Sequence, residues 1–368
     1  MIHPAPAPAL VASPLDADGL RARVQTALDD FLAQQRSVLG ELGPECTPLV
    51  DAVERLLAGG KRLRPAFCYW AYRAAGGADG DGAVRAATAL ELFQAAALIH
   101  DDVMDSSDTR RGMPAVHRQF AALHDDRGWR GSGESFGAAA AILAGDLCLS
   151  WCDELLSSSG LPQGAIDRAK PAFDRMRTQL MAGQYLDVLA QAVATGEPGD
   201  AVARALRVVQ FKSAKYSVEH PLLIGGLLAG ADDDVLASYS AYGLPLGEAF
   251  QLRDDVLGVF GDPASTGKPA GDDLREGKRT VLVALTLRGA DADQARVVDR
   301  LLGDPDLDQV GVAALRSVIV ATGALATVEE MIAERVQQAY DALDRARIAP
   351  EARQVLHALV DAATARAS

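Results

Sequence analysis

Two clusters of aspartates most constrain what this chain can fold into. The first reads Asp101-Asp102-Val103-Met104-Asp105, and the second, far along the chain, begins at Asp254-Asp255. On a helix, Asp101 and Asp105 leave the same face one turn apart. Like charges at that spacing destabilise an isolated helix, so the pattern predicts a compensating divalent cation such as Mg²⁺. Two such faces opposite each other would hold a diphosphate between them through metal ions.

Either cluster alone also fits a solvated helix surface, which is the commoner role of paired aspartates. The flanking residues argue against that alternative. The segment 95–99 before the first cluster reads Ala-Ala-Ala-Leu-Ile, and the second cluster lies between Ala249-Phe250 and Val256-Leu257. Carboxylates within apolar helices are costly unless they are paired or bound to metal. The sequence therefore favours two metal-binding clusters.

The composition predicts an all-α fold. Hydrophobic residues make up 49% of the 368-residue chain, aromatic residues only 5%, and runs of alternating β-branched residues are nearly absent. Glycine and proline interrupt the helical periodicity at short intervals, as in a compact bundle. We expect a disordered Pro/Ala-rich arm at 1–14 and one domain at 15–368, an antiparallel helical bundle around a central cavity. The loop from Gly261 to Gly277 is a candidate lid.

Several classes of function are disfavoured. A net charge of −14 argues against nucleic-acid binding, because a phosphate backbone needs a basic surface. Every long apolar stretch contains a charge or a helix breaker, so no membrane span is expected. The start of the chain lacks the pattern of a signal peptide. Four cysteines without zinc-type spacing suit a reducing compartment, and we expect a cytoplasmic protein.

Cations that match the carboxylates recur along the chain. Gly59-Gly60-Lys61-Arg62-Leu63-Arg64-Pro65 places two glycines beside three cations before a helix, which suits an anion cradle. Arg110-Arg111-Gly112 follows the first cluster, Lys212 lies on a helical stretch, and Lys268 and Lys278 follow the second cluster. Each alone is most simply a surface cation. Together they describe a cleft for two diphosphates, one held through metals and one by cations alone.

These motifs resemble those of the trans-isoprenyl diphosphate synthases, the polyprenyl synthetase family, over nearly the whole chain after the arm. The matching segments, in family order, are Gly60–Pro65, Asp101–Asp105, Arg110–Pro114, Gly183-Gln184-Tyr185-Leu186-Asp187, Lys212-Ser213-Ala214, Phe250–Asp255, Gly261–Pro269 and Asp273–Thr280. Members of this family are helical enzymes that condense isopentenyl diphosphate with an allylic diphosphate, head to tail. The resemblance implies the same transferase activity here, with geranylgeranyl diphosphate as product, and a homodimer.

The resemblance also implies roles for individual residues. Three Mg²⁺ ions would be held by Asp101, Asp105 and Asp254, with Asp102, Asp255 and Asp187 as secondary metal-binding carboxylates. The allylic diphosphate would contact Arg110, Lys212, Lys268, Gln184 and Lys278. Isopentenyl diphosphate would bind without metal, through Lys61, Arg64, Gln94 and Arg111. The catalytic residues would be Lys212, Ser213, Gln251 and Lys268; of these, the Lys212 carbonyl, the Ser213 hydroxyl and the Gln251 amide would stabilise an allylic carbocation.

Product length is expected to depend on the helix that precedes Asp101. In the family, bulky residues four and five positions before the first aspartate stop growth at fifteen carbons; Ala97 and Ala96 stand there in this chain. Phe93 is then either the floor of a deeper pocket or ordinary core packing. With Phe93 as the floor, we expect a twenty-carbon product.

The chain departs from the family pattern at three places. Gly258 stands where many relatives carry a third aspartate, Ser213 replaces the usual threonine, and 125–136 is an insertion without an assigned role. The alternatives are a longer-chain polyprenyl diphosphate synthase, a class I terpene cyclase and a non-catalytic subunit of a heteromeric synthase. A cyclase would not need the second cationic cradle, and non-catalytic subunits usually carry eroded aspartate motifs.

Overall fold

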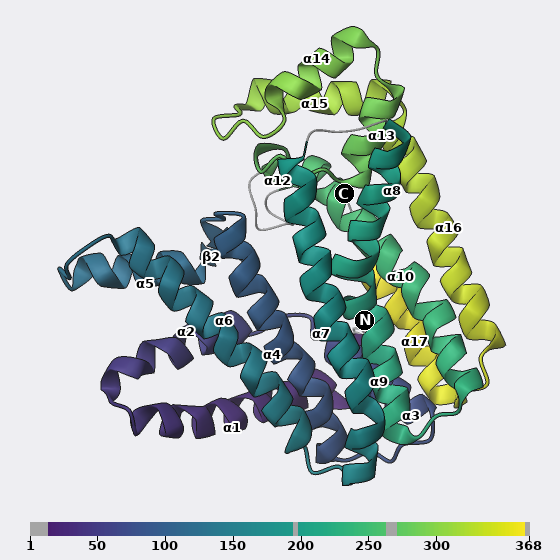
Figure 1. Ribbon diagram of the computed structural model, residues 1–368. Coiled ribbons are helices and arrows are strands. Elements are labelled where there is room, and N and C mark those ends of the chain that lie inside the picture. Colours follow the sequence, from purple (N-terminus) through teal and green to yellow (C-terminus); the bar gives the residue numbers. More distant parts are fainter. Residues whose placement is uncertain (1–13, 194–197, 263–270, 365–368) are drawn as a thin grey trace, which may run out of the picture.

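Helices make up nearly all of the computed structural model, which describes residues 14–193, 198–262 and 271–364 (Figure 1). The all-α prediction is confirmed. The elements of the first half are η1 (Pro14–Gly19), α1 (Leu20–Gly40), η2 (Pro44–Cys46), α2 (Thr47–Leu57), α3 (Leu63–Ala74), α4 (Asp81–Met104), β1 (Thr109–Arg110), β2 (Met113–Pro114), α5 (Val116–Asp126), α6 (Gly133–Ser157) and α7 (Gln163–Ala192).

The second half is also helical. Its elements are α8 (Pro198–Val208), η3 (Val209–Glu219), α9 (His220–Ala229), α10 (Asp233–Phe260), α12 (Asp272–Arg275), α13 (Val281–Gly289), α14 (Ala292–Leu301), α15 (Gln309–Ala321), α16 (Ala324–Arg345) and α17 (Pro350–Thr364). The expected arm lies outside the described residues except for Pro14, which already belongs to η1. Residues 263–270 of the expected lid also lie outside them, and the described part contains α12.

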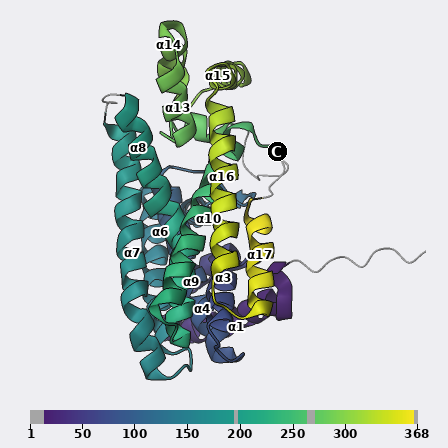
Figure 2. The same ribbon diagram turned by 90° about the vertical axis from the view of Figure 1, so that its right-hand side faces the viewer.

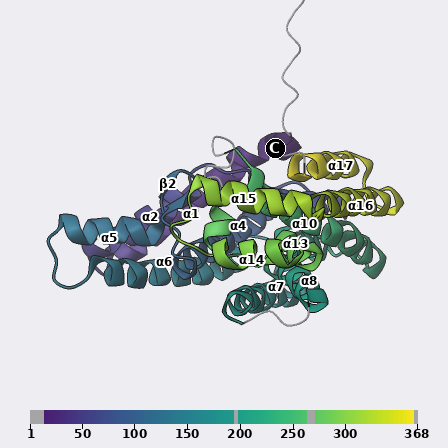
Figure 3. The same cartoon turned by 90° about the horizontal axis from the view of Figure 1, so that it is seen from above.

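The helices are arranged in an elongated bundle. α7, α8, α10 and α16 run along its length, and α13, α14 and α15 cover one end (Figure 2). Seen from above, α5 and α6 extend away from this body as a helical hairpin (Figure 3). α6 packs against α4, and η3 packs against both α7 and α10. The two aspartate clusters lie at the C-terminal ends of α4 and α10.

Two hydrophobic clusters fill the interior. One joins α1 to α9 with the C-terminal helices, and the other lies under α8 and α12 to α15. α10 and α16 contribute buried residues to both clusters, which ties the two regions together. Arg253 of α10 binds Glu329 of α16 through two hydrogen bonds of 2.6 and 2.7 Å. This pair fixes α16 beside the turn that carries Asp254.

Local sequence explains where key helices begin. Asp232 accepts a hydrogen bond from the backbone N–H of Val235 and caps α10. Thr280 caps α13 in the same way. The extra feature that sequence did not predict is the hairpin β1–β2, in which Arg110 pairs with Met113. Its two turn residues, Arg111 (φ 54°) and Gly112 (φ 73°), both have left-handed backbones, as tight hairpins require.

The segment Val209–Glu219 is a π-helix, a form that often marks functional sites. Pro221 follows it at the start of α9, where it lacks the N–H that a continuous α-helix would use. Two glycines allow close packing on either side. A Cβ at Gly183 of α7 would lie 2.5 Å from the backbone N of Lys212, and one at Gly247 of α10 would lie 2.6 Å from the carbonyl oxygen of Ala214.

α4 and α6 are each long and apolar enough to cross a membrane, by length and composition alone. A third candidate would require α15 and α16 to act together across a bend of 66°. We expected no membrane span, but by length and hydropathy these helices could form one. In α4 the apolar character is explained by packing, since 72% of its most apolar window is buried, but the figure for α6 is only 39%. α6 thus keeps a partly exposed apolar face.

The close packing at Gly183 predicts an unequal response to alanine along α7. In Gly183→Ala the new methyl group collides with the backbone of η3, so we expect a loss of about 1–3 kcal/mol in unfolding free energy. Gly164→Ala in the same helix is the control, because its Cβ would meet only Arg168 Nη1 at 3.9 Å. There we expect no loss, or a gain of up to about 1 kcal/mol. Urea unfolding curves measure both, and equal stability of the two variants would contradict the packing.

Candidate active site

The first aspartate cluster is held by groups from two other helices. Oδ1 of Asp101 accepts hydrogen bonds from Nε2 of Gln184 at 2.8 Å and from Nζ of Lys212 at 3.1 Å. Lys212 also binds Oδ2 of Asp187 at 2.5 Å. α4, α7 and η3 therefore bring together four of the residues that the sequence assigned to the allylic and metal sites.

The charges in this group support one another. Burial opposes ionisation of Asp101, but Lys212, Lys278 and Arg110 outweigh it and hold the pKa of Asp101 below its ordinary value. Burial likewise opposes protonation of Lys212, and the carboxylates of Asp101 and Asp187 nevertheless raise its pKa. Lys212 and Asp101 are thus both ionised at neutral pH.

Lys278 neutralises the other end of the cluster. Its Nζ lies 3.3 Å from Oδ2 of Asp105, 2.6 Å from Oε2 of Glu276 and 3.8 Å from Oδ1 of Asp273. Burial disfavours the ammonium, but these carboxylates raise the pKa of Lys278 well above its ordinary value. For Asp105, burial and the charge of Asp101 raise the pKa even though Lys278 opposes them. Of the two carboxylates, Asp105 is therefore the one whose ionised form is less stabilised by the protein, and a further cation would stabilise it.

Asp102 faces a different partner. The guanidinium of Arg110 binds its buried carboxylate through two nitrogens, with Nε 2.9 Å from Oδ1. The same guanidinium lies 3.7 Å from Oδ2 of Asp101. Burial works against the charge of Arg110, but Asp102 and Asp101 raise its pKa. Asp102 therefore anchors Arg110 beside the first cluster; metal binding by Asp102 stays a prediction.

The second cluster lies at the end of α10. Asp255 is buried and accepts a hydrogen bond from Nε2 of Gln251 at 2.7 Å. Burial, with smaller contributions from Asp273 and Asp254, raises the pKa of Asp255 to about 8, although the bond from Gln251 opposes this. The Gln251 amide, which the sequence assigned to carbocation stabilisation, is thus oriented by Asp255. Asp254 is half-buried and lies one position earlier.

One cation influences carboxylates of both clusters. The charge of Lys278 acts on Asp101 and Asp105 of the first cluster and on Asp255 of the second. Among the described residues, no group of three or more His, Cys, Asp or Glu side chains converges on one point to hold a metal by itself. That arrangement fits Mg²⁺, which usually takes one or two carboxylates and completes its shell with water and substrate phosphate.

One orphaned atom also fits a hard cation. Oδ2 of Asp105 is buried and accepts no hydrogen bond, although Lys278 lies nearby. A buried carboxylate oxygen without a hydrogen bond is costly, and a divalent cation would satisfy it. The donor set of Asp101, Asp105 and Asp254 is all oxygen, which Mg²⁺ prefers.

The cationic cradle before α3 has a residue that sequence reasoning did not single out. Arg62 is buried and left-handed (φ 55°), with Nη1 2.5 Å from Oε2 of Glu91. Its Nη2 binds Oε1 of Gln25 at 2.6 Å and also the carbonyl of Leu57. Arg62 therefore fixes the loop rather than facing a ligand. The sequence did not predict this role, because Arg62 stands in a run of three cations and no sequence pattern identifies Glu91 as its partner.

Arg111 lies beside the same loop. Its Nη1 donates to the carbonyl of Leu56 at 3.1 Å, and a Cβ at Gly60 would come within 3.3 Å of that nitrogen. Desolvation lowers the pKa of Arg111, although the carboxylate of Glu91 opposes this. The positive charges of Arg62, Arg110 and Arg64 lower the pKa further. Lys61 is exposed on the loop, and Gln94 is partly exposed on α4. An anion bound here would relieve the repulsion between these cations.

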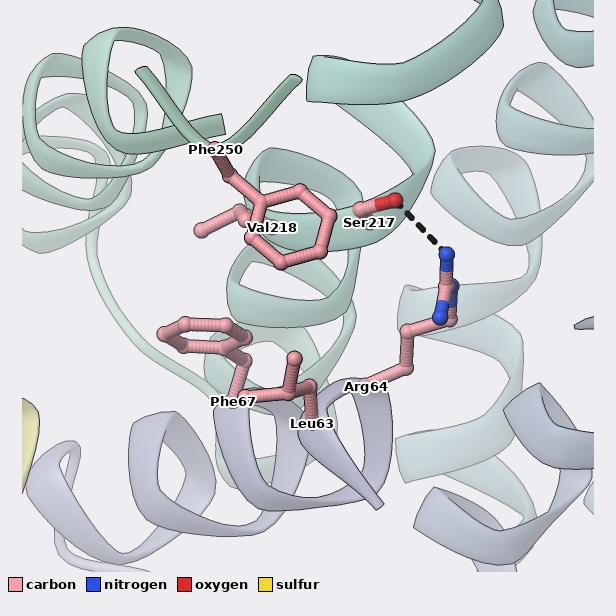
Figure 4. Close-up of a pocket in the computed structure, with 6 residues that line it drawn as sticks. All are labelled: Leu63, Arg64, Phe67, Ser217, Val218 and Phe250. Atoms are coloured by element: carbon pink, nitrogen blue, oxygen red, sulfur yellow. Dashed lines mark hydrogen bonds between the residues drawn. The ribbon is translucent and has the colours of Figure 1, made fainter. Parts of the chain in front are cut away.

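Arg64 lines one side of a small pocket between α3, η3 and α10, and its guanidinium is turned toward Ser217 (Figure 4). Its Nη2 donates to the hydroxyl oxygens of Tyr216 at 2.6 Å and Ser217 at 2.7 Å. The guanidinium carbon lies 4.3 Å from the Tyr216 ring centroid, within the range of a cation–π interaction. The pocket is lined by Leu63, Arg64, Phe67, Ser217, Val218 and Phe250.

Phe93 is connected to this pocket through Tyr216. The two rings meet edge to face with centroids 6.2 Å apart, and Phe93 is fully buried. Ala96 is also buried, whereas Ala97 is partly exposed. Full burial suits both core packing and a pocket floor, so the chain-length role of Phe93 stays a prediction. Tyr216, to which the sequence gave only a packing or orienting role, links the Phe93 ring to Arg64.

Two sequence-based assignments fall elsewhere. Lys268 lies outside the described residues, so its assignment stays an expectation. The insertion 125–136 comprises the end of α5, the turn that follows it and the start of α6, at the tip of the helical hairpin. There His124, Trp129 and Phe136 pack together, with the Trp129 and Phe136 ring centroids 5.2 Å apart. These contacts are those of a structural cap on the hairpin.

Comparisons with known proteins show the family of this chain. The family model for polyprenyl synthetase matches residues 47–318, which include the cationic loop and both aspartate clusters. A geranylfarnesyl diphosphate synthase of Aeropyrum pernix is 34% identical over 310 residues, 83% of this chain and 89% of the relative. A geranylgeranyl diphosphate synthase of Sulfolobus acidocaldarius is 34% identical over 252 residues, 67% of this chain and 69% of the relative.

A solved structure shares the whole fold. The geranylgeranyl pyrophosphate synthase of Corynebacterium glutamicum, in complex with isoprenyl diphosphate and magnesium, superposes with a TM-score of 0.91. The identity is 39%, and the match covers 95% of this chain and 99% of the other. By its motifs, its fold and these relatives, the chain belongs to the polyprenyl synthetase family.

Proposed function

We propose that the protein is a Mg²⁺-dependent trans-prenyltransferase that condenses isopentenyl diphosphate with allylic diphosphates to give geranylgeranyl diphosphate. The observation that carries the proposal is the arrangement around Lys212 and Lys278. These two ammonium groups lie against Asp101 and Asp105 at the end of α4 and against Asp187 of α7. A separate group of cations follows α2, so the protein offers one mixed site and one purely cationic site.

The metal site is assigned to the two clusters. Asp101, Asp105 and Asp254 would hold Mg²⁺, and we propose three ions in the presence of a diphosphate. The magnesium in the related Corynebacterium glutamicum structure supports the choice of metal. When bound, Mg²⁺ supplies Lewis-acid neutralisation of charge on the departing diphosphate.

The chain's own residues would bind and orient the allylic substrate. Lys212 and Arg110 already point toward Asp101, so their N–H groups are placed to donate to diphosphate oxygens beside that carboxylate. Charge-assisted hydrogen bonds of this kind stabilise the charge that develops as the carbon–oxygen bond breaks. Gln184 and Lys278 would complete the contacts.

The carbocation that remains would be stabilised by η3 and α10. The π-helix carries the Lys212 carbonyl and the Ser213 hydroxyl, and Gln251 on α10 is held in one orientation by Asp255. The double bond of isopentenyl diphosphate then attacks the cation, and a proton leaves to the released diphosphate. Exclusion of water is essential, because water would quench the cation.

Isopentenyl diphosphate would bind to Lys61, Arg64, Gln94 and Arg111. Lys61 lies on the loop that contains Gly59 and Gly60, and Arg111 lies beside it. Backbone N–H groups and cations there could bind an anion. Arg64 would exchange one of its hydrogen bonds to Tyr216 and Ser217 for the diphosphate. This second cradle favours a two-substrate synthase over a class I terpene cyclase.

The assembly is proposed to be a cytoplasmic homodimer without a membrane span. α6 supports the dimer, because its apolar side chains Ile142 and Leu143 are 46% and 57% exposed. Large exposed apolar patches commonly mark interfaces. A second copy of the chain would cover this face, which otherwise resembles neither a solvated surface nor a packed core.

The proposed function is tested by incubating the protein with Mg²⁺, labelled isopentenyl diphosphate and dimethylallyl, geranyl or farnesyl diphosphate in turn. Sizing of the dephosphorylated products should show a dominant twenty-carbon alcohol. Longer alcohols would support the longer-chain alternative. A cyclised product from one substrate alone would favour the cyclase, and no condensation with any primer would contradict the proposal in favour of a non-catalytic subunit.

Phe93→Ala should lengthen the product. Removal of the ring opens space below Ala97 and beside Tyr216, so longer alcohols should replace the twenty-carbon one. Phe173→Ala on α7 is the control for simple core loss, because Phe173 is equally buried. Product chromatography separates the two. Unchanged chain length in Phe93→Ala, or equal lengthening in the control, would remove Phe93 as the floor.

The two cationic sites should separate kinetically. Lys212→Gln removes a charge beside Asp101 and should raise KM for the allylic substrate by about 10- to 100-fold, the effect of one or two charged hydrogen bonds. Arg111→Gln should raise KM for isopentenyl diphosphate by a similar factor. Steady-state kinetics with each substrate varied in turn measures this. Equal effects of either variant on both substrates would contradict two separate sites.

The apolar face of α6 should govern assembly. Leu143→Glu places a charge within that face and should shift the protein from dimer to monomer in light scattering coupled to gel filtration. Val310→Glu is the matched control, because Val310 is 76% exposed at the other end of the molecule. A monomeric wild-type protein, or dimers of both variants, would argue against this interface.

A further inference from the structure

A buried ion pair joins the cationic loop before α3 to the helix α4. Nη1 of Arg62 lies 2.5 Å from Oε2 of Glu91, and the two side chains are only 2% and 4% exposed. An exposed pair would contribute little, but the loss of one partner of a buried pair leaves an uncompensated charge in the interior. The loop is therefore tied to α4 at Arg62.

Arg62 sets the path of the chain between two residues that we assign to the second substrate. Its backbone is left-handed, with φ 55°, which is strained for a residue with a Cβ. Its carbonyl accepts a hydrogen bond from the N–H of Ala66 at 3.0 Å, at the start of α3. Lys61 directly precedes Arg62, and Arg64 lies in the first turn of α3. The backbone of Arg62 thus determines the direction in which both cations leave the chain.

The other donors of Arg62 are also used by the protein. Its Nη2 donates to Oε1 of Gln25 on α1 at 2.6 Å and to the carbonyl of Leu57. A second contact from α1 holds the same loop, because Nη2 of Arg21 donates to the carbonyl of Gly60 at 3.3 Å. The contacts of Arg62 therefore fix the loop from two helices.

Glu91 has a further connection to the cationic cradle. Within the part of the chain that the structure describes, its buried Oε1 accepts no hydrogen bond. Burial lowers the pKa of Arg111, and the charge of Glu91 opposes this. Gln94, also assigned to the cradle, follows Glu91 by three residues on α4, about one helical turn. Glu91 is thus adjacent to the cradle as well as paired with Arg62.

A simpler role for the pair would be to stabilise the packing of α3 on α4. That role alone explains a buried ion pair poorly, because apolar side chains of similar size in its place are often equally or more stabilising. It also leaves the strained backbone of Arg62 unexplained. A side chain that must hold one backbone conformation accounts for both observations.

We propose that Glu91 is a positioning residue of the metal-free cradle, which holds Arg62 in its left-handed conformation and so places Lys61 and Arg64 for the second diphosphate. The inference rests on the proposed function, since it deepens the assignment of that site. Charge and positioning predict opposite effects of removing the carboxylate. If only its negative charge acted, an anion would bind more tightly without it; if it positions the loop, the anion binds more weakly.

The test measures anion binding without metal or turnover. Isothermal titration calorimetry follows inorganic diphosphate binding to the full chain in EDTA, so that the metal site does not contribute. Glu91→Gln keeps the size of the side chain and should raise the Kd by about 10-fold, the effect of one charged hydrogen bond. Arg111→Gln, which removes a cation of the cradle, should abolish the binding and thereby assign it to this site.

Steady-state kinetics supply the second readout. In Glu91→Gln the KM for isopentenyl diphosphate should rise by about 10-fold, while the KM for the allylic substrate stays within about twofold of wild type. Glu248→Gln is the matched control, because Glu248 pairs with Arg335 at 2.6 Å between α10 and α16. It should change neither KM. A lower Kd for diphosphate in Glu91→Gln, or an equal rise in both KM values, would overturn the proposal.

The double variant R62M/E91M separates positioning from stability. It removes both charges and leaves neither uncompensated, so its melting temperature should recover relative to Glu91→Gln. The KM for isopentenyl diphosphate should stay raised, because the loop is no longer tied to α4. Recovery of that KM together with the melting temperature would show that the pair only stabilises the fold, and would overturn the proposal.

The binding assay also distinguishes this inference from the proposed function. If the wild type binds diphosphate in EDTA but condenses no primer, the proposed function fails, and the binding data still decide the role of Glu91. If the wild type condenses its substrates but binds no diphosphate without metal, the metal-free cradle is wrong, and only the role of Glu91 fails with it.

Discussion

The neutralisation of buried carboxylates by Lys212 and Lys278 is the interaction on which the rest of the site depends. Asp101, Asp102 and Asp105 lie within five residues at the end of α4, where they would repel one another and destabilise the last turn. These carboxylates form ion pairs with cations from η3, from the β1–β2 hairpin and from the segment after α12. Segments far apart in the chain therefore converge on one helix end because of charge. The hydrophobic clusters then fix the geometry of that convergence.

This charge balance also suits catalysis. The cations that neutralise α4 in the free protein are the groups that a diphosphate would engage, so binding requires exchange of partners more than movement of helices. The close contacts at Gly183 and Gly247 place η3 firmly between α7 and α10. A preorganised set of N–H donors of this kind lowers the cost of stabilising charge in the transition state. The second, metal-free cradle that we propose lies beside Arg62, whose buried bond to Glu91 fixes the loop.

Much of this was predictable from sequence, and the failures have physical causes. Helical spacing placed Asp101 and Asp105 together, and apolar flanks indicated burial. Motif order brought Lys212 to the first cluster, as the structure shows. The partner of Arg62 was not predictable, because Glu91 carries no local pattern. Nor was the close packing of the Asp273 side chain against Gly258, which depends on how α12 packs. The π-helix was missed because apolar periodicity hardly distinguishes it from an α-helix.

The central claim is that both aspartate clusters bind one diphosphate through divalent ions. A crystal structure with Mn²⁺ and an unreactive allylic diphosphate analogue, read by anomalous scattering, tests this most directly. The account predicts metal peaks at Asp101 and Asp105 and a further peak at Asp254, with the diphosphate between them and Lys212 and Arg110 on its oxygens. A diphosphate held only by the cations near Gly60, or metal at one cluster alone, would contradict it.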